Sequence, residues 1–420
     1  MFETISMIGL GYIGLPTATL FASRKKKVIG VDVNQHAVDT INQGKIHIVE
    51  PELDVLVQKA VADGWLRATT KPEAADAFLI AVPTPFKDGH QPDLSYIESA
   101  AKAIAPVLKK GDLVVLESTS PVGATEQMAA WLAEARADLT FPQQAGEEAD
   151  VQVAHCPERV LPGQVVRELV TNDRVIGGMT QKASAMAVAL YKTFVEGECI
   201  VTNARTAEMC KLTENSFRDV NIAFANELSM ICDKQGINVW ELIALANRHP
   251  RVNILQPGAG VGGHCIAVDP WFIVASNPDE AKIIRTAREV NDYKPEWVLE
   301  KVKSAIVDVM AKKPGSTIQD IKVACLGLAF KPDIDDLRES PAVDITNNIA
   351  TLGCSVFVVE PNINNLPDNL CFKNLKLVSL ENALKKADVV CIQVKHKQFT
   401  SSRKIIFDVE KAIDAVGMQY

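Results

Sequence analysis

The sequence lacks the cysteine patterns that mark disulfide-stabilised or zinc-binding proteins. Its 420 residues include nine cysteines, with no C-x-x-C pair and no Cys/His cluster of zinc-ligand spacing. An odd cysteine count without framework spacing fits a reducing compartment, where disulfides are rare. We therefore expect a cytoplasmic protein without a metal site.

The chain also lacks an excess of positive charge and any long apolar run. Its net charge of -8 argues against a nucleic-acid partner, because phosphate binding needs a basic surface. The first residues, MFETISMIGLGYIGLP, do not combine the basic region, apolar run and cleavage site of a signal peptide. No apolar stretch reaches the length of a transmembrane helix. We expect neither nucleic acid nor a membrane as a partner.

What the chain does contain predicts an α/β protein of two or three domains. In the first part, short apolar runs such as DAFLIAVPTP and DLVVLESTSPVG alternate with helical text, which predicts a parallel, doubly wound Rossmann sheet over residues 1–200. The segment 205–235 holds no proline or glycine and predicts one long helix within a central helical domain, 201–310. Residues 311–420 repeat the layout of the first domain with fewer glycines, which predicts a second, Rossmann-like fold.

A glycine-rich turn near the start predicts dinucleotide binding. GLGYIG (residues 9–14) matches G-x-G-x-x-G between a predicted strand and a predicted helix, and Asp32 ends the next strand. Gly9, Gly11 and Gly14, with Tyr12 and Ile13 between them, would bring backbone close to a pyrophosphate. The Asp32 carboxylate suits a ribose 2′-hydroxyl and repels a 2′-phosphate, which favours NAD over NADP. The alternative is a purely structural glycine turn.

Three threonines follow predicted strands at the edge where α/β sheets bind ligands. We predict that Thr84, Thr119 and Thr125 contact the cofactor. Turn and cap chemistry explains any one of them equally well.

Two further stretches carry reactive side chains. On the predicted long helix, Lys211, Asn215 and Arg218 share one face, although a solvated charged stripe is the common alternative. The stretch PGAGVGGHCIAVDP (residues 257–270) joins a flexible loop to Cys265 and Asp269. A thiol there is either a nucleophile or a small buried apolar group.

Six motifs in order resemble the UDP-glucose/GDP-mannose dehydrogenase family, over nearly the whole chain. They are the Gly9 turn, STSPVGAT, CPERVLPG, AEMCKLTENSFRDVNIAFANE, HPRVNILQPGAGVGGHCIAVDP and GLAFKPDIDDLRESPA. NRHPRVNI and GGHCIAVDPWF are most similar to the bacterial branch that oxidises UDP-N-acetyl-D-mannosamine for surface polysaccharides such as enterobacterial common antigen or capsule. The chain departs from the family at Ala259, where a proline is frequent, and at its end, which lacks the Asp-x-Lys-Gly turn.

The resemblance implies a four-electron oxidation of the C6 alcohol to an acid with two NAD. Cys265 would form a thiohemiacetal and then a thioester, which water hydrolyses. Lys211 and Asn215 would steady oxyanions, Asp269 would order water or tune Lys211, and Glu158 would aid hydrolysis. His264, beside the thiol, is expected to face away from it.

The resemblance also implies the binding positions and a homodimer formed through the helix at 205–235. Arg338 is expected near NAD, and His249 and Arg251 near the substrate across the dimer interface. The other substrate-binding positions are Arg159, Val160, Lys211, Asn215, Arg218, Gly262, Phe330 and Lys331.

Three alternative functions are compatible with the sequence. The same chemistry could act on UDP-glucose or UDP-N-acetylglucosamine. A non-catalytic NAD-binding scaffold would need none of Cys265, Lys211 and Asp269. A two-electron 3-hydroxyacid-type dehydrogenase would need neither the thiol nor a third domain.

Overall fold

The structure is a computed structural model that describes residues 2–48, 50–161, 163–263, 265–400 and 412–415. His264 and residues 404–411 of the divergent C-terminal end lie outside the described residues. The chain forms two compact units, residues 1–214 and 215–420, which we describe separately. The three-domain boundaries at 200 and 310 stay predictions.

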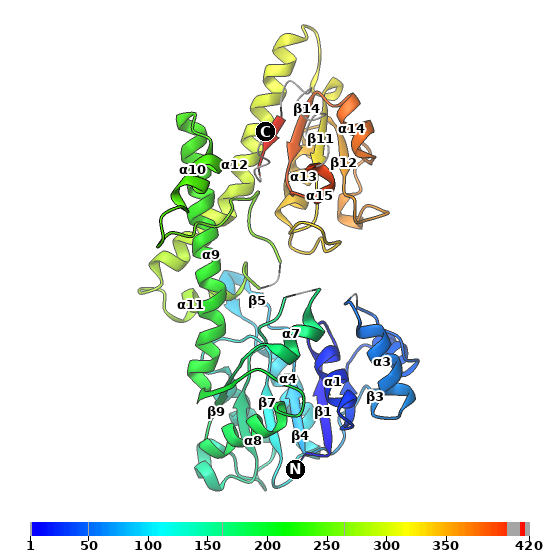
Figure 1. Ribbon diagram of the computed structural model, residues 1–420, viewed down its shortest axis with the longest axis vertical. Helices are drawn as coiled ribbons and strands as arrows, with labels where there is room; N and C mark the ends of the chain where they lie inside the picture. Colours follow the sequence, from blue (N-terminus) through cyan, green and yellow to red (C-terminus); the bar gives the residue numbers. More distant parts are fainter. Residues whose placement is uncertain (1, 49, 162, 264, 401–411, 416–420) are drawn as a thin grey trace. The chain divides into compact units, whose positions relative to one another are not determined.

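The first unit is built on an eight-stranded sheet with the order β10-β9-β8-β7-β4-β1-β2-β3 (Figure 1). All neighbouring strands are parallel except the antiparallel pair β8 and β9. The strands are β1 (Thr4–Ile8), β2 (Lys27–Val31), β3 (Leu66–Thr69), β4 (Ala77–Ile80), β7 (Leu113–Leu116), β8 (Gln152–His155), β9 (Arg174–Gly178) and β10 (Cys199–Asn203). A separate small hairpin pairs β5 (Phe86–Lys87) with β6 (Gln91–Pro92).

Helices cover both faces of this sheet. Alternate residues of β4 belong to two different apolar clusters, Leu79 to one and Phe78 and Ile80 to the other, because successive side chains in a strand point to opposite faces. Strands buried on both faces explain the continuous apolar runs in the sequence. The helices are α1 (Gly14–Ser23), α2 (Gln35–Asn42), α3 (Leu53–Ala62), α4 (Ser95–Ile104), α5 (Ala124–Ala135), α6 (Pro142–Ala145), α7 (Val165–Thr171) and α8 (Gln181–Tyr191).

Long helices follow, as the sequence predicted. The helix α9 (Ala204–Gln235) contains residues of both units. In the second unit it is followed by α10 (Val239–Ala246), α11 (Asp269–Ser276) and α12 (Lys282–Lys312). Within the second unit, buried polar side chains join α9 to α12: Arg288 donates to Asp219 across 2.6 Å.

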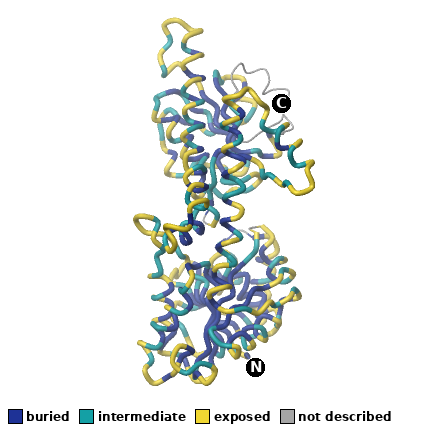
Figure 2. The backbone as a smooth tube through the Cα atoms, turned by 90° about the vertical axis from the view of Figure 1, so that its left-hand side faces the viewer, coloured by how far each residue is buried: buried dark blue, intermediate teal, exposed yellow. Residues whose placement is uncertain are grey.

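The second unit also holds a smaller, fully parallel sheet with the order β13-β12-β11-β14-β15. Apolar residues of α12, among them Val298, Val302 and Ile306, share one core with β11 and β12. Figure 2 shows the buried backbone concentrated inside each unit. The strands are β11 (Lys322–Leu326), β12 (Ser355–Val359), β13 (Leu375–Leu377), β14 (Val389–Ile392) and β15 (Ala412–Asp414), and the helices are α13 (Pro341–Thr351), α14 (Leu380–Lys386) and α15 (Lys397–Thr400).

The predicted fold class is confirmed: two Rossmann-like sheets, of which the first is parallel except for the pair β8 and β9, are separated in the sequence by helices. Within the described part of the chain, no helix has the length and apolar character to cross a bilayer. In the same residues, no group of three or more His, Cys, Asp or Glu side chains is placed to hold a metal ion.

Candidate active site

The glycine turn between β1 and α1 has the geometry of a pyrophosphate cradle. Gly9 has a φ of +91°, and a Cβ there would lie 2.3 Å from the carbonyl oxygen of Ala81. A Cβ on Gly14 would lie 1.8 Å from the carbonyl oxygen of Gly9, whereas one on Gly11 would meet no atom within 4 Å. Gly9 and Gly14 are therefore needed for the turn itself, and Gly11 leaves its outer side open. Tyr12 and Ile13 complete the turn into α1, and the Tyr12 side chain is exposed.

Asp32 lies beside this turn, directly after β2. Its Oδ2 accepts a hydrogen bond from the Leu10 N–H at 2.9 Å, and its Oδ1 accepts from the Asn34 N–H at 2.9 Å. The side chain is only half-buried, so each oxygen keeps a lone pair that a ribose hydroxyl can reach. The turn and the acid together fit NAD.

The threonines predicted to contact the cofactor differ in their surroundings. Thr84 follows β4, and its buried Oγ1 has no hydrogen-bond partner within the described chain, which is uncommon for a buried hydroxyl. Thr119 is half-buried next to Ser118, whose hydroxyl donates to Val82 O at 2.7 Å and joins the loops after β4 and β7. Thr125 is fully buried. These contacts place Thr84 and Thr119 on adjacent loops.

Thr125 has a structural partner that the sequence did not indicate. The carboxylate of Glu208, from α9, accepts hydrogen bonds from the Thr125 hydroxyl at 2.6 Å, the Thr125 N–H at 2.8 Å and the Gly123 N–H at 2.7 Å. Glu208 thus caps the N-terminus of α5, which favours a negative charge. A cofactor contact of Thr125 stays a prediction.

Glu158 and Lys211 lie close together in the first unit. Glu158 follows β8, is 8% exposed, and its Oε1 has no hydrogen-bond partner in the described residues. Burial raises the pKa of Glu158, and the opposing attraction of Lys211 and then Arg174 is smaller. A carboxyl group with a raised pKa next to an ammonium group is suited to exchange protons. Lys211 itself is half-buried.

Neighbouring Arg159 and Val160 are half-buried at the same edge of the sheet. The guanidinium of Arg159 forms a 2.6 Å ion pair with Glu214. Its Nη1 also donates to the carbonyl oxygen of Asp173 at 3.3 Å. These two contacts orient the Arg159 side chain.

A second buried acid, Glu117, interacts electrostatically with Glu158 and was not among the predicted site residues. Glu117 directly follows β7, is 2% exposed and accepts a 2.6 Å hydrogen bond from the Tyr191 hydroxyl. Burial raises the pKa of Glu117 to about 7, and Arg174 opposes that rise. The Arg174 guanidinium lies 5.2 Å from the centre of the Tyr191 ring. The acidic residue within the predicted strand-end motif LESTS was the available signal.

The second unit brings Asn215, Asp269 and Cys265 together. The Asn215 Nδ2 donates to Asp269 Oδ2 at 2.5 Å, and the two side chains are 6% and 4% exposed. The Cys265 carbonyl accepts from the Val268 N–H at 3.1 Å and the Asp269 N–H at 2.9 Å, which begins α11. Cys265 is exposed, whereas Asp269 is buried. The alternative, a small buried thiol at this position, therefore does not apply.

The glycine-rich loop before Cys265 packs tightly against residues 330–341. A Cβ on Gly262 would lie 2.3 Å from the Glu339 carbonyl oxygen, and one on Gly263 would lie 3.2 Å from the Phe330 ring. Glycine is required here because another backbone and a ring approach closely. This contact brings the predicted substrate-binding residues Gly262 and Phe330 together, with Lys331 next in the chain.

The other predicted binding residues lie at the surface of the second unit. Arg218 is exposed on α9, and His249 and Arg251 are exposed after α10, where the Arg251 N–H donates to His249 Nδ1 at 3.3 Å. Arg338 pairs with Asp336 at 2.6 Å. The binding roles of these four residues stay predictions.

Comparison with known proteins agrees with the motifs. Residues 3–195, 205–293 and 324–415 match the NAD binding, central and UDP binding domains of the UDP-glucose/GDP-mannose dehydrogenase family. The UDP-N-acetyl-D-mannosamine dehydrogenase of Yersinia pestis is 68% identical over 421 residues, which are 99% of each chain. The NDP-N-acetyl-D-galactosaminuronic acid dehydrogenase of Ralstonia nicotianae is 65% identical, over 99% of this chain and 96% of that protein.

The solved structure of the UDP-D-ManNAc dehydrogenase from Pyrococcus horikoshii has the same fold. It aligns with a TM-score of 0.87 and 38% identity, over 99% of this chain and 96% of that one. Together with the domain matches, this likeness confirms the predicted resemblance: the chain belongs to the UDP-glucose/GDP-mannose dehydrogenase family.

Proposed function

We propose that the protein oxidises UDP-N-acetyl-D-mannosamine at C6 to UDP-N-acetyl-D-mannosaminuronate, using NAD. One observation supports the chemistry: Cys265 is exposed directly after a glycine-rich loop. Its carbonyl oxygen accepts a hydrogen bond from the N–H of Asp269, the first residue of α11, and the Asp269 carboxylate accepts a hydrogen bond from Asn215. The near full-length likeness to UDP-N-acetyl-D-mannosamine dehydrogenases supports the choice of sugar.

The chain's own residues account for the covalent part of the reaction. When bound at the glycine turn, NAD supplies the hydride acceptor for each of the two oxidations. The Cys265 thiolate adds to the C6 aldehyde to form a thiohemiacetal, whose oxidation gives a thioester. Water then cleaves the C–S bond, which releases the acid and restores the thiol. Lys211 stabilises the oxyanion, and Glu158 accepts a proton from the attacking water.

The substrate-binding residues in this proposal are those that the family resemblance implies. They are Arg159, Val160, Lys211, Asn215, Arg218, His249, Arg251, Gly262, Phe330 and Lys331. The product is an acidic sugar nucleotide suited to surface-polysaccharide synthesis, and we place the enzyme in the reducing cytoplasm.

A panel of nucleotide sugars assayed for NADH release tests the substrate. We expect two NADH per UDP-N-acetyl-D-mannosamine and a catalytic efficiency at least about 10²-fold above that for UDP-glucose, because a site built for the acetamido group loses a polar contact with glucose. UDP-N-acetylglucosamine should be poor, since its acetamido group is equatorial. The name of the Ralstonia relative, an NDP-N-acetyl-D-galactosaminuronic acid dehydrogenase, makes an N-acetyl-D-galactosamine nucleotide the second candidate. Equal efficiency with UDP-glucose would contradict the proposal.

We also propose a homodimer formed through α9. Phe217, Phe224 and Ile231 recur every seven residues on one face of this helix and are 68%, 51% and 42% exposed. Phe224 also lines a shallow groove with Ile283, at the start of α12. Large apolar side chains grouped in this way mark association surfaces. Phe224→Glu should shift sedimentation from dimer to monomer, and a monomeric active wild type would overturn the dimer.

A further inference from the structure

The second sheet repeats the nucleotide-binding geometry of the first, with one difference. The Gly327 N–H donates to Val359 O at 2.8 Å, as Gly9 does to Val31. Glu360 takes the place of Asp32: its Oε2 accepts from the Leu328 N–H at 2.7 Å, and its Oε1 accepts from the Asn362 N–H at 3.1 Å. Asp32 is half-buried, but Glu360 is 4% exposed.

The difference is His396, which fills the space beside the acid. Ala81 and Gln393 occupy equivalent positions, since their N–H groups donate to Ile8 O and Leu326 O after the equivalent strands β4 and β14. His396 therefore corresponds to Thr84. Its Nε2 lies 3.0 Å from Glu360 Oε2. Because both oxygens of the buried Glu360 carboxylate already accept hydrogen bonds, Glu360 is less accessible to a ribose hydroxyl than Asp32 is.

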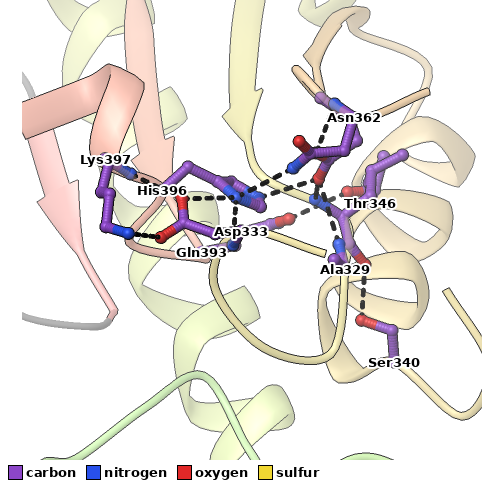
Figure 3. Close-up of polar contacts among 10 residues, drawn as sticks. Ala329, Asp333, Ser340, Thr346, Asn362, Gln393, His396 and Lys397 are labelled. Carbon is purple, nitrogen blue, oxygen red and sulfur yellow. Dashed lines mark hydrogen bonds and ion pairs between the residues drawn. The ribbon is translucent and has the colours of Figure 1, made fainter. Parts of the chain in front are cut away.

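The contacts of His396 define its tautomer. The Asp333 N–H lies 2.9 Å from Nδ1, and the Asn362 Nδ2 lies 3.3 Å from the same nitrogen (Figure 3). Because both groups donate, Nδ1 must carry a lone pair, and Nε2 must carry the proton that it donates to Glu360. The imidazole thus connects the ends of β12 and β14 to the turn at Asp333.

Glu360 and His396 hold both ends of one short loop. Glu360 binds the N–H groups of Leu328 and Ala329, and His396 binds that of Asp333, where φ is +62°. A left-handed conformation is unfavourable for a residue other than glycine and persists only when its surroundings hold it. Phe330 and Lys331 lie between these two fixed points.

Two additional hydrogen bonds hold the loop at residues 328–333. The Lys397 N–H donates to Asp333 Oδ1 at 3.0 Å, and the Ser340 hydroxyl donates to Leu328 O at 2.6 Å. Residues 328–333 are therefore fixed from β12, from β14 and from the start of α13. These hydrogen bonds restrict the conformations of the loop, which lowers the entropic cost of binding a ligand.

We propose that His396, acting through Glu360 and the Asp333 N–H, is a positioning residue that fixes Phe330 and Lys331 for binding the nucleotide half of the substrate. The inference rests on the substrate-binding role given to those two residues in the proposed function. It assigns the second sheet's acid to holding a loop, where the first sheet's acid is available to a ribose.

Kinetics of His396 variants test the proposal. His396→Leu removes donor and acceptor, and should raise the KM for UDP-N-acetyl-D-mannosamine and the Kd for UDP about tenfold, while the KM for NAD and kcat change less than about threefold. His396→Gln should recover most of the loss, because its amide can accept from Asp333 and donate to Glu360.

A double-mutant cycle separates positioning from general destabilisation. Lys331→Ala should cost less affinity for UDP in the His396→Leu protein than in wild type, because the loop has already lost its shape. Additive effects would overturn the proposal. Asn374→Ala is the matched control: it removes two hydrogen bonds in the same unit, to Ala350 O and Cys354 O, and should lower Tm without changing the Kd for UDP.

Different results would contradict the proposed substrate and the proposed role of His396. If the wild-type enzyme releases no NADH with UDP-N-acetyl-D-mannosamine, the proposed substrate is wrong. If wild type is active and folded His396→Leu binds UDP normally, only the role of His396 is wrong. If His396→Leu does not fold, His396→Ala, which also removes donor and acceptor, takes its place, and the same outcomes and the cycle built on it decide.

Discussion

Asn215 and Asp269, 54 positions apart in the sequence, are joined by a 2.5 Å hydrogen bond in a part of the second unit that excludes most water. The amide holds the carboxylate at the first residue of α11, four residues after the Cys265 thiol. Removing a hydrogen-bond donor from a buried carboxylate costs free energy, because little water can replace it.

Asn215→Ala should therefore lower kcat about 10- to 100-fold with little change in the KM for NAD. Asn215→Asp should lower it further, because two carboxylates would face each other at hydrogen-bond distance. Thr213→Ala, an exposed position on the same helix, is the control and should behave as wild type. Wild-type kcat in Asn215→Ala would show that the pair is only structural.

Cys265→Ala should abolish formation of the acid, because no thioester can form without the thiol. NAD should bind as in wild type, since the glycine turn is untouched. Product analysis and calorimetric NAD titration check both results. The buried Cys232 provides a control, and Cys232→Ala should keep full turnover. Normal turnover in Cys265→Ala would exclude covalent catalysis.

Lys211→Ala should reduce turnover by about 10²- to 10⁴-fold, the range for a positioned acid or base. The same change removes the charge that opposes the raised pKa of Glu158, so that pKa should rise further. Because Glu158 acts as a carboxylate, the acidic limb of the pH–rate profile should then move to higher pH. Lys234→Ala, exposed near the end of the same helix, is the control. A loss of turnover below tenfold would favour the alternative that Lys211 belongs to a solvated charged stripe on the helix.

Asp32 should determine the choice of NAD over NADP. Asp32→Asn keeps an acceptor for the Leu10 N–H and removes the charge that repels a 2′-phosphate, so relative efficiency with NADP should rise at least about tenfold. Asp39→Asn, an exposed carboxylate on α2, should leave the ratio unchanged. Equal use of both cofactors by wild type would mean that Asp32 does not distinguish a ribose 2′-hydroxyl from a 2′-phosphate.

Glu117 should make the free energy of unfolding depend on pH. Its pKa is raised from 4.5 to about 7, so the folded state holds this proton more tightly than the unfolded state. The stabilisation is complete below pH 4.5 and is lost as pH rises to about 7, by about 3 kcal/mol. Glu117→Gln should reduce this dependence of the free energy of unfolding on pH, measured by urea titrations at a series of pH values. Exposed Glu134→Gln is the control, and an unchanged slope in Glu117→Gln would contradict the assignment.

Local patterns in the sequence determined the elements and the cofactor turn. Gly9, Gly14 and Asp32 could be predicted because their conformational and hydrogen-bonding demands act within one β-strand, turn and helix unit. The long helix α9 followed from the absence of glycine and proline over 205–235. The roles of Cys265 and Lys211 came from resemblance to a family, since no local rule distinguishes a reactive thiol or amine from an ordinary one.

Only the tertiary structure decided which side chains lie together and which are buried. Glu117 and Tyr191 are 74 residues apart, and His396 and Glu360 are 36 apart, so no periodicity could connect either pair. Thr125 matched a cofactor position by sequence, yet in the fold its hydroxyl binds Glu208. The physical reason is the same in each case: desolvation and hydrogen bonding depend on groups that meet only when strands and helices pack.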